Sequence, residues 1–334
     1  MSDKMRVEVE NDKSFSAWFS SRKVQRRLTI FLFMLMPIVL LFTFTYLPFG
    51  EMVKFSFYKM KYIGERTYVG WKNYQKVFEN PEYFSSLKLS FFYMIGAFIQ
   101  LALSLYLATL LSFKVKFGNL FKGCMFFPYL INGIAVGFIF KFFFTHGFVF
   151  DTVLEAFGFN IDKLPYWLRD PGVNNWSLAG SSIWRYFGQN MILFIGAIMS
   201  VDNELYEAAM LDGCNKVQQF FYVTLPNIRT VLLLNVILAI TGSLAAFEPP
   251  YVITGGANGT ATYFVKMNEV AHTSQKVGQA SAMAVVLLVI ILFATLVQKL
   301  AVKYAFRDVE YDGPELNVHR KKIRIPAADK KGSK

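Results

Sequence analysis

Long apolar stretches alternate with short polar segments along the chain. Each stretch has about 20 residues, enough to cross roughly 30 Å of hydrocarbon at about 1.5 Å per residue. None shows the period-2 alternation of barrel strands, and backbone amides inside a bilayer must find their partners within the segment. The pattern predicts an all-α membrane protein with six spans, at residues 28–50, 89–112, 123–145, 178–201, 230–253 and 277–298.

Basic residues beside the first span predict the orientation. The run R-K-V-Q-R-R at residues 22–27 abuts this span, and the positive-inside rule places it in the cytoplasm. The apolar run is too long for a signal-peptide h-region and no A-x-A-like site follows it, so we expect an uncleaved anchor. Six spans return the C-terminus to the same side. We therefore expect a multi-pass membrane protein with both termini in the cytoplasm.

The chain divides into three parts. Residues 1–27 form a cytoplasmic segment in which aromatic and basic residues mix at 14–23, a pattern that suits either an interfacial helix or a disordered tail. Residues 28–301 form the membrane domain. Residues 302–334 form a polar cytoplasmic tail whose composition predicts disorder. No segment between the spans is long enough to build a core of its own.

Composition and motifs narrow the function. Hydrophobic residues make up 54% of the chain and charged residues 17%, with a net charge of +12. The positive charge follows the membrane flanks, where anionic lipid headgroups attract it, so we do not expect nucleic-acid binding. The sequence has no phosphate-binding loop, no His or Cys pair with metal spacing and no H-E-x-x-H. We therefore expect a non-catalytic chain that binds no metal and no cofactor itself.

A polar segment between the fourth and fifth spans reads E-L-Y-E-A-A-M-L-D-G-C-N-K-V-Q-Q-F-F-Y-V-T-L-P, residues 204–226. Acidic residues at its start complement the positive end of a helix dipole, and paired alanines favour a helix with one thin side. Gly213 predicts the end of this helix, residues 216–222 can form a second one, and Pro226 starts the return to the membrane. The expected shape is a helix, a turn and a second helix.

This segment resembles the EAA loop of permease subunits of binding-protein-dependent ATP-binding-cassette importers. That pattern is E-A-A, three residues, G, about nine residues, and then I-x-L-P. Strings similar to the sugar branch of the family extend the resemblance to residues 28–300. They are V-G-W-K-N-Y (69–74), N-P-E-Y-F (80–84), F-F-P-Y-L-I (126–131), W-L-R-D-P (167–171), T-G-G (254–256) and G-Q-A-S-A (278–282).

The resemblance implies the six-helix fold of a type I importer in the plasma membrane of a bacterium, and a set of partners. These are a second, homologous permease, a dimer of ATPase subunits that bind ATP and Mg, an extracellular solute-binding protein, membrane lipid and a transported sugar or oligosaccharide. It also implies that the loop at 202–228 is a coupling helix that docks into an ATPase subunit. The coupling residues are then Glu207, Ala208, Ala209, Gly213, Leu225 and Pro226.

A polar face on the fourth span marks a candidate pathway for the substrate. Its polar side chains recur every three or four residues, and polar groups in a bilayer usually face the bundle interior or a wet cavity. The fifth span adds a small polar patch at mid-depth. These positions align with sugar-contacting positions of the maltose transporter in the same family. They are Ser182, Arg185, Tyr186, Gln189, Gly242 and Ser243, with the aromatic residues Trp184 and Phe187 nearby.

Alternatives remain open from the sequence. The polar face can instead hold the bundle together through interhelical hydrogen bonds. Arg185 can snorkel outward, pair with Glu248, or face the cavity, where it would favour an acidic glycan. A solute similar to glycerol 3-phosphate is compatible with the same machinery. A stand-alone secondary transporter would need coupling carboxylates within its spans, and Glu248 is the one carboxylate found there.

Overall fold

The computed structural model describes residues 22–112 and 116–305. The expectations about the N-terminal segment up to residue 21 and about the tail beyond residue 305 lie outside these residues. Internal contacts divide the chain into two units, 1–295 and 296–334, and the boundary falls within the last helix. The cores, the polar networks and the cavity described below lie in the first unit, and of the described residues only the last turns of the final helix belong to the second.

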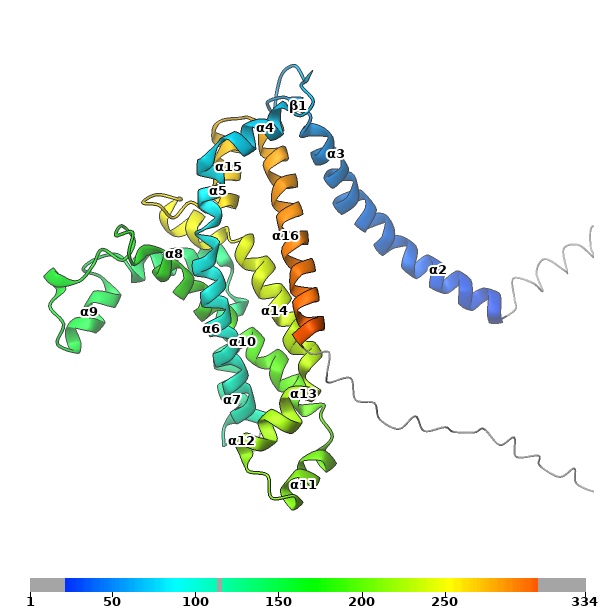
Figure 1. Ribbon diagram of the computed structural model, residues 1–334, viewed down its shortest axis with the longest axis vertical. Coiled ribbons are helices and arrows are strands. Elements are labelled where there is room, and N and C mark those ends of the chain that lie inside the picture. The colour runs from blue at the N-terminus through cyan, green and yellow to red at the C-terminus, as the bar shows by residue number, and fades with distance from the viewer. Residues whose placement is uncertain (1–21, 113–115, 306–334) are drawn as a thin grey trace, which may run out of the picture. The chain divides into compact units, whose positions relative to one another are not determined.

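Helices make up nearly all of the described elements (Figure 1). The exception is a pair of two-residue antiparallel strands, β1 (Tyr58–Lys59) and β2 (Thr67–Tyr68), with Tyr58 opposite Tyr68. The helices are α2 (Arg22–Leu41), α3 (Leu47–Phe55), α4 (Lys72–Glu79), α5 (Pro81–Leu87), α6 (Ser90–Ser112), α7 (Gly118–Leu130), α8 (Gly133–Phe143), α9 (Val149–Ala156), α10 (Asn174–Met199), α11 (Asn203–Leu211), α12 (Lys216–Gln219), α13 (Leu225–Asn227), α14 (Arg229–Leu244), α15 (Tyr263–Asn268) and α16 (Val277–Ala305). Short π or 3-10 turns are η1 (Phe42–Tyr46), η2 (Ile161–Lys163), η3 (Phe220–Thr224), η4 (Pro250–Thr254) and η5 (Glu269–Thr273).

Apolar helices long enough to cross a membrane account for most of the expected spans. Three described segments qualify, namely Gln25–Phe55, Pro81–Ser112 and Val277–Ala301. Two bent pairs raise the number to five if each pair is one span: α7 with α8, bent by 96°, and Lys216–Asn227 with α14, bent by 74°. The remaining expected span, 178–201, coincides with α10, which has 26 residues but carries too many polar side chains to be among them.

The expected span at 123–145 is not one continuous helix. The backbone is extended at Ile131, and the Asn132 side chain caps a new helix by accepting a hydrogen bond from the Ile134 N–H at 2.9 Å. An Asn in this position satisfies a backbone donor that the first turn leaves unpaired. The third expected span is therefore a broken segment, and its break gives α8 a helix N-terminus of its own.

The expected span at 230–253 also ends early, because α14 stops at Leu244. Pro249 and Pro250 have no N–H groups to donate to the carbonyls four residues earlier, so a continuous helix would leave those carbonyls unpaired. The Ala246 carbonyl instead accepts a hydrogen bond from the Thr262 hydroxyl at 2.6 Å. Irregular backbone consequently occupies residues 245–247.

The central core forms where α10 packs along α6, α7 and α14. Its buried side chains come mainly from α6 and α10 and include Leu101, Ala108, Met191, Phe194 and Ile195. A Cβ atom added to Gly188 would lie 1.7 Å from the Met125 carbonyl oxygen, so α7 and α10 cross in near backbone contact. Glycine permits such close crossings of helices in membranes.

A second core joins α4, α5, α15 and α16. The Tyr263 side chain is fully buried there, and its hydroxyl donates to the Met283 carbonyl at 3.1 Å. Lys266 Nζ lies 2.8 Å from Glu82 Oε1, and this hydrogen bond raises the pKa of Lys266. These contacts fix the short helices that follow the first expected span against the start of α16.

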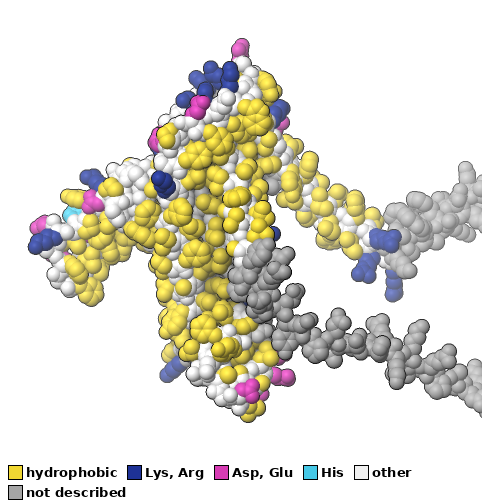
Figure 2. All heavy atoms as spheres, viewed as in Figure 1, with side chains coloured by type: hydrophobic (Ala, Val, Ile, Leu, Met, Phe, Trp, Pro, Cys, Tyr) yellow, Lys and Arg dark blue, Asp and Glu magenta, His cyan; other side chains and the backbone are white. Residues whose placement is uncertain are grey.

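The surface separates apolar and charged groups. Figure 2 shows hydrophobic side chains over α6 and over the part of α16 nearer β1, whereas charged side chains gather near β1, near α9, at the start of α2 and, mainly as Asp and Glu, near α11. No side chain is buried in the most apolar window of Gln25–Phe55. This distribution is that of helices whose apolar surfaces face lipid or other membrane helices.

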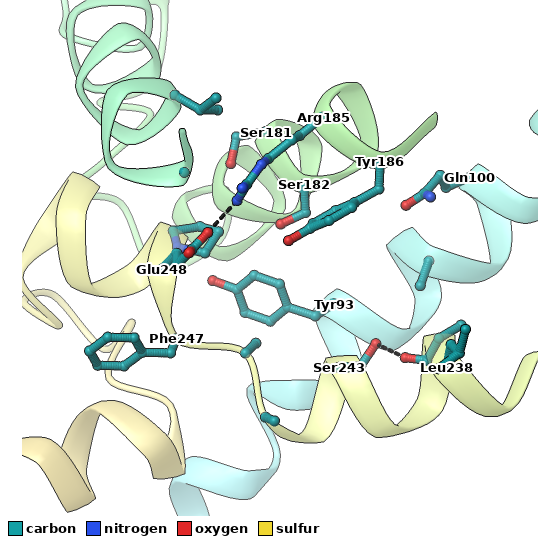
Figure 3. Close-up of a pocket in the computed structure, with 18 of the residues that line it drawn as sticks. Tyr93, Gln100, Ser181, Ser182, Arg185, Tyr186, Leu238, Ser243, Phe247 and Glu248 are labelled. Atoms are coloured by element: carbon teal, nitrogen blue, oxygen red, sulfur yellow. Dashed lines mark hydrogen bonds and ion pairs between the residues drawn. The ribbon is translucent and has the colours of Figure 1, made fainter. Parts of the chain in front are cut away.

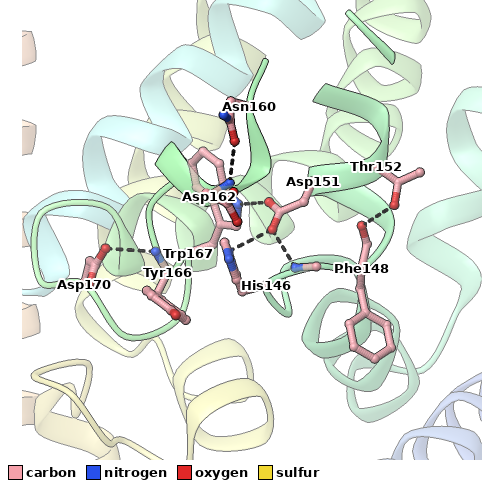
Figure 4. A network of polar contacts seen from close by, with 10 residues as sticks. His146, Phe148, Asp151, Thr152, Asn160, Asp162, Tyr166, Trp167 and Asp170 are labelled. Atoms are coloured by element: carbon pink, nitrogen blue, oxygen red, sulfur yellow. Dashed lines mark hydrogen bonds and ion pairs between the residues drawn. The ribbon is translucent and has the colours of Figure 1, made fainter. Parts of the chain in front are cut away.

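Residues 144–173, between α8 and α10, are held together by a buried carboxylate (Figure 4). Asp151 has no exposed surface and accepts hydrogen bonds from the Gly147 N–H and from Trp167 Nε1, both at 2.6 Å. His146 Nδ1 lies 2.9 Å from the same carboxylate. The Asp151 network therefore ties α9 to the chain on both of its sides.

The approach at Gly188 yields a first prediction. Gly188→Ala should lower the free energy of unfolding of the detergent-solubilised protein by about 1–3 kcal/mol or more, because the added methyl group forces α7 and α10 apart. Its melting temperature should fall accordingly. Gly180→Ala is the matched control, since it lies on the same helix with open space around its Cβ position. It should be neutral or stabilising by up to about 1 kcal/mol through helix propensity. Equal melting temperatures for the two variants would contradict the packing.

The Asp151 network yields a second prediction. Asp151→Ala leaves the Trp167 and Gly147 N–H groups unpaired, at about 1–3 kcal/mol each. Amide hydrogen exchange should accelerate within residues 144–173 and stay unchanged in α10. The exposed Asp162 lies in the same segment, and Asp162→Ala should leave exchange as in the wild type. Unchanged protection in the Asp151 variant would show that the network does not hold the segment.

Candidate functional site

A cavity of about 450 Å³ lies among α6, α8, α10, α14 and the irregular stretch after α14 (Figure 3). This volume falls within the roughly 300–1,000 Å³ of small-molecule sites. The breaks before α8 and after α14 both open onto it. The cavity thus forms where two apolar segments are interrupted and where α10 is most polar.

All six residues expected on a substrate pathway line this cavity. α10 contributes four of them and α14 contributes two, so the polar face of α10 and the patch on α14 meet across the same space. Of the nearby aromatic residues, Tyr186 lines the cavity, whereas the Trp184 ring packs against Phe140 with centroids 5.3 Å apart. Which of these side chains touches a substrate stays a prediction.

Few polar side chains of this cavity are engaged in hydrogen bonds between helices. The side chains of Ser182 and Gln189 make no hydrogen bond to a neighbouring helix within residues 22–112 and 116–305. Ser243 donates to the Ala239 carbonyl of its own helix at 2.7 Å. Polar groups that served only to join helices would be paired between helices. Here most of them leave hydrogen-bonding capacity directed into the cavity.

Two further buried polar atoms lack partners. The Tyr93 hydroxyl and Arg185 Nε have no hydrogen-bond partner in the described part of the chain. Tyr93 is 5% exposed, and Figure 3 shows its hydroxyl pointing into the cavity toward Glu248. An unpaired buried polar group costs about 1–3 kcal/mol, and a ligand hydroxyl that pairs with it recovers this energy. The cavity therefore offers hydrogen-bonding groups to a polar ligand.

Arg185 is paired with Glu248 across the cavity wall, by an ion pair between Nη1 and Oε2. The Arg185 guanidinium also lies over the Tyr186 ring, 5.1 Å from its centroid. Of the options left open by the sequence, the ion pair is the one that forms. Arg185 lines the cavity at the same time, so pairing and facing the cavity are not exclusive.

Sequence reasoning missed several lining residues. Tyr93 and Gln100 come from α6, Asn190 from α10 and Asn235 from α14. A single amide side chain within an otherwise apolar stretch, as at Gln100 or Asn235, was the available signal, because such groups in a span usually face the interior. Gly133 and Gly137 of α8 also line the cavity, and no sequence pattern pointed to them.

The segment expected to couple to an ATPase folds as predicted, into α11, a turn and α12. Gly213 has φ +81°, a left-handed conformation that few other residues adopt, and its N–H bonds to the Met210 carbonyl at 3.1 Å. Asn215 and Gln218 form a reciprocal capping box at the start of α12. Tyr206 of α11 is 3.0 Å from the Thr224 hydroxyl, which joins the two halves of the segment.

The expected coupling residues divide between two places. Glu207 and Ala208 are exposed on α11 and Ala209 is half-buried, whereas Leu225 and Pro226 belong to α13, where the chain turns toward α14. Large apolar side chains are also exposed beside them: Leu205, Met210, Leu211, Val217 and Tyr222. Exposed apolar groups at a polar end of the molecule are typical of a docking surface.

Comparison with known families identifies the fold. A model of the family described as "Binding-protein-dependent transport system inner membrane component" matches residues 100–304. The chain belongs to this family. Its matched region contains α10, α14, the segment α11–α13 and most of the cavity lining. The predicted type I permease fold is confirmed, and the chain is a multi-pass membrane protein of a transport system.

Similar proteins extend the match over most of the chain. It is 32% identical to the probable ABC transporter permease protein YurN of Bacillus subtilis (strain 168), over 82% of this chain and 96% of that protein. It is 31% identical to the arabinooligosaccharides transport system permease protein AraP of Halalkalibacterium halodurans, over 87% of this chain and 92% of that protein.

A solved structure shares the fold. A chain of a bacterial ABC transporter involved in the import of the acidic polysaccharide alginate superimposes with a TM-score of 0.68 at 20% identity, over 83% of this chain and 97% of that chain. At this identity the likeness concerns the arrangement of helices alone.

Proposed function

We propose that the chain is the membrane permease subunit of an ATP-driven importer that moves a sugar or oligosaccharide into the cell. The main support is the cavity at the junction of α6, α10 and α14. It combines neutral polar side chains, buried hydrogen-bond donors without partners and the Tyr186 ring. Sugar recognition needs many hydrogen-bonding groups beside an apolar face. Similarity to a permease named for arabinooligosaccharides supports the same class of cargo.

The cavity is the proposed passage, opened to either side of the membrane in turn. Broken helices are the elements that allow such motion, because an interruption can act as a hinge without costing further backbone hydrogen bonds. The break at Ile131 and the irregular residues 245–247 both lie beside the cavity. Movement of α8 or of the stretch after α14 would change its access.

Energy for this motion is proposed to come from a dimer of partner ATPase subunits that bind ATP and Mg. The chain has no phosphate-binding loop, and the described residues hold no cluster of His, Cys, Asp and Glu fit for a metal. The segment α11–α13 would insert into one ATPase subunit in the cytoplasm, where we also place the N-terminus. A second, homologous permease would supply the other coupling segment, and an extracellular binding protein would deliver the sugar.

A stand-alone secondary transporter is a weaker explanation. It would need a carboxylate free to bind a coupling ion, yet Glu248, the carboxylate that lines the cavity, is held by Arg185. The exposed apolar surface on α11 and α12 would also have no role in such a protein.

Filling the cavity should stop transport. Gly242 lines the cavity with open space at its Cβ position, so Gly242→Leu adds a side chain there without a clash in the helix. We expect uptake of labelled neutral oligosaccharides by cells that depend on this chain to fall by about tenfold or more, because the leucine side chain occupies space that the ligand needs and a loss of about 1.4 kcal/mol of binding free energy is tenfold. Gly196→Leu, on an exposed position of α10 outside the cavity, should keep wild-type uptake. Normal uptake in the Gly242 variant would remove the cavity from the pathway.

Distorting the turn at Gly213 should uncouple transport from ATP hydrolysis. A β-branched residue at φ +81° costs about 1–2 kcal/mol of backbone strain. This cost lowers the population of the native turn relative to other conformations by roughly 5–30-fold. Gly213→Val should reach the membrane but lose ATP-dependent uptake, and Glu207→Lys, which reverses an exposed charge on α11, should do the same.

Gly158→Val is the matched control for this experiment. Gly158 has φ +93° and open space around it, but it lies in residues 144–173, far along the chain from the coupling segment. It should carry similar strain and retain uptake. Full ATP-coupled uptake by both Gly213→Val and Glu207→Lys would contradict the proposed docking.

A further inference from the structure

Charge around the cavity is balanced to zero. Among the described lining residues, the groups ionised at neutral pH are Arg185 and Glu248, and these two form an ion pair. The other polar lining groups are hydroxyls and amides. An approaching ligand therefore meets hydrogen-bonding groups but no uncompensated charge.

The ion pair fits into a space left by a glycine of α8. A Cβ atom on Gly133 would lie 2.0 Å from Glu248 Oε2 and 2.4 Å from Arg185 Nη1, so the absence of a side chain at Gly133 makes room for both groups. Gly133 is the first residue of α8, where the positive end of the helix dipole stabilises a carboxylate. Three elements, α8, α10 and the stretch after α14, thus converge on one charge pair.

The two partners differ in access. The Arg185 side chain is 16% exposed, and the Glu248 side chain is 46% exposed. The guanidinium is enclosed by the carboxylate and by the Tyr186 ring. An anionic ligand that approached Arg185 would therefore meet the Glu248 carboxylate first, and two carboxylates beside one guanidinium repel each other.

We propose that Glu248 determines the charge specificity of the pathway: by neutralising Arg185, it makes the cavity accept uncharged sugars and reject glycans that carry uronate groups. This rests on the proposed function, because it assumes that a glycan enters the cavity. Binding sites commonly gain specificity from a fixed charge that repels ligands carrying a charge of the same sign. Glu248 acts here through Arg185, and Gly133 positions the pair.

The test compares matched glycans that differ only in a carboxylate. The full-length chain, purified from membranes into lipid nanodiscs with the subunits that accompany it, is titrated calorimetrically with pairs of trisaccharides. Each pair has the same linkage, for example β-1,4-mannotriose and β-1,4-mannuronate trimer, with equivalent glucose and galactose pairs. Wild-type protein should bind the neutral member of a pair at least about tenfold more tightly, as expected when a like charge faces an anion.

Glu248→Gln keeps the size of the side chain and releases the charge of Arg185. The ratio of affinities should shift toward the uronate by about tenfold or more, and the double variant Arg185→Gln with Glu248→Gln should return it toward the neutral sugar. If Glu248→Gln protein does not insert, Ser182→Lys provides an unpaired cation in the cavity with the ion pair intact. It should raise uronate binding, and the neutral control Ser182→Gln should not.

The outcomes separate this inference from the function on which it rests. If neutral sugars bind the wild type but Glu248→Gln and Ser182→Lys leave the ratio unchanged, charge neutralisation is overturned and the sugar permease stands. Equal binding of both members of a pair by the wild type overturns it as well. If no trisaccharide of any pair binds the wild type, the proposed cargo fails and this inference fails with it.

Discussion

The need to shield the polar face of α10 from lipid organises this molecule. α10 carries amide, hydroxyl and guanidinium groups along much of its length, and such groups are costly in hydrocarbon. α6, α7 and α14 surround it, and the near backbone contact at Gly188 lets α7 approach closely enough to contribute. The same shielding creates the cavity. The helices around α10 cover its polar face but form few hydrogen bonds with it, so a space lined by polar side chains remains between them.

Interrupted helices complete this interior. A continuous helix satisfies its own backbone and presents only side chains, whereas the break at Ile131 and the end of α14 at Leu244 expose helix termini and irregular backbone. Both interruptions border the cavity, and the N-terminus of α8 meets the Arg185–Glu248 pair there. Polar backbone at membrane depth is tolerated where protein or a wet cavity covers it.

Sequence patterns predicted the elements whose cause is local. The spans at 89–112 and 277–298 begin within one residue of α6 and α16, and the turn at Gly213 follows from a glycine after a short helix. The breaks in the third and fifth spans were missed, because hydrophobicity averaged over about 20 residues conceals a single cap such as Asn132. Spacing and resemblance to a family singled out six residues for a substrate pathway, and the structure places all six on the cavity wall, whereas their contact with a substrate stays a prediction. Gly133 was not singled out, since its importance lies in atoms brought to it by Arg185 and Glu248.

The Asp151 network has a mechanical consequence. Each group that contacts this carboxylate, from His146, Gly147 and Trp167, belongs to residues 144–173 themselves. A change of angle between α8 and α10 would therefore leave the shortest polar contacts of this segment intact. Such a segment can be carried as a preformed block, and it would keep its own shape if the proposed motion changes the angle between these helices.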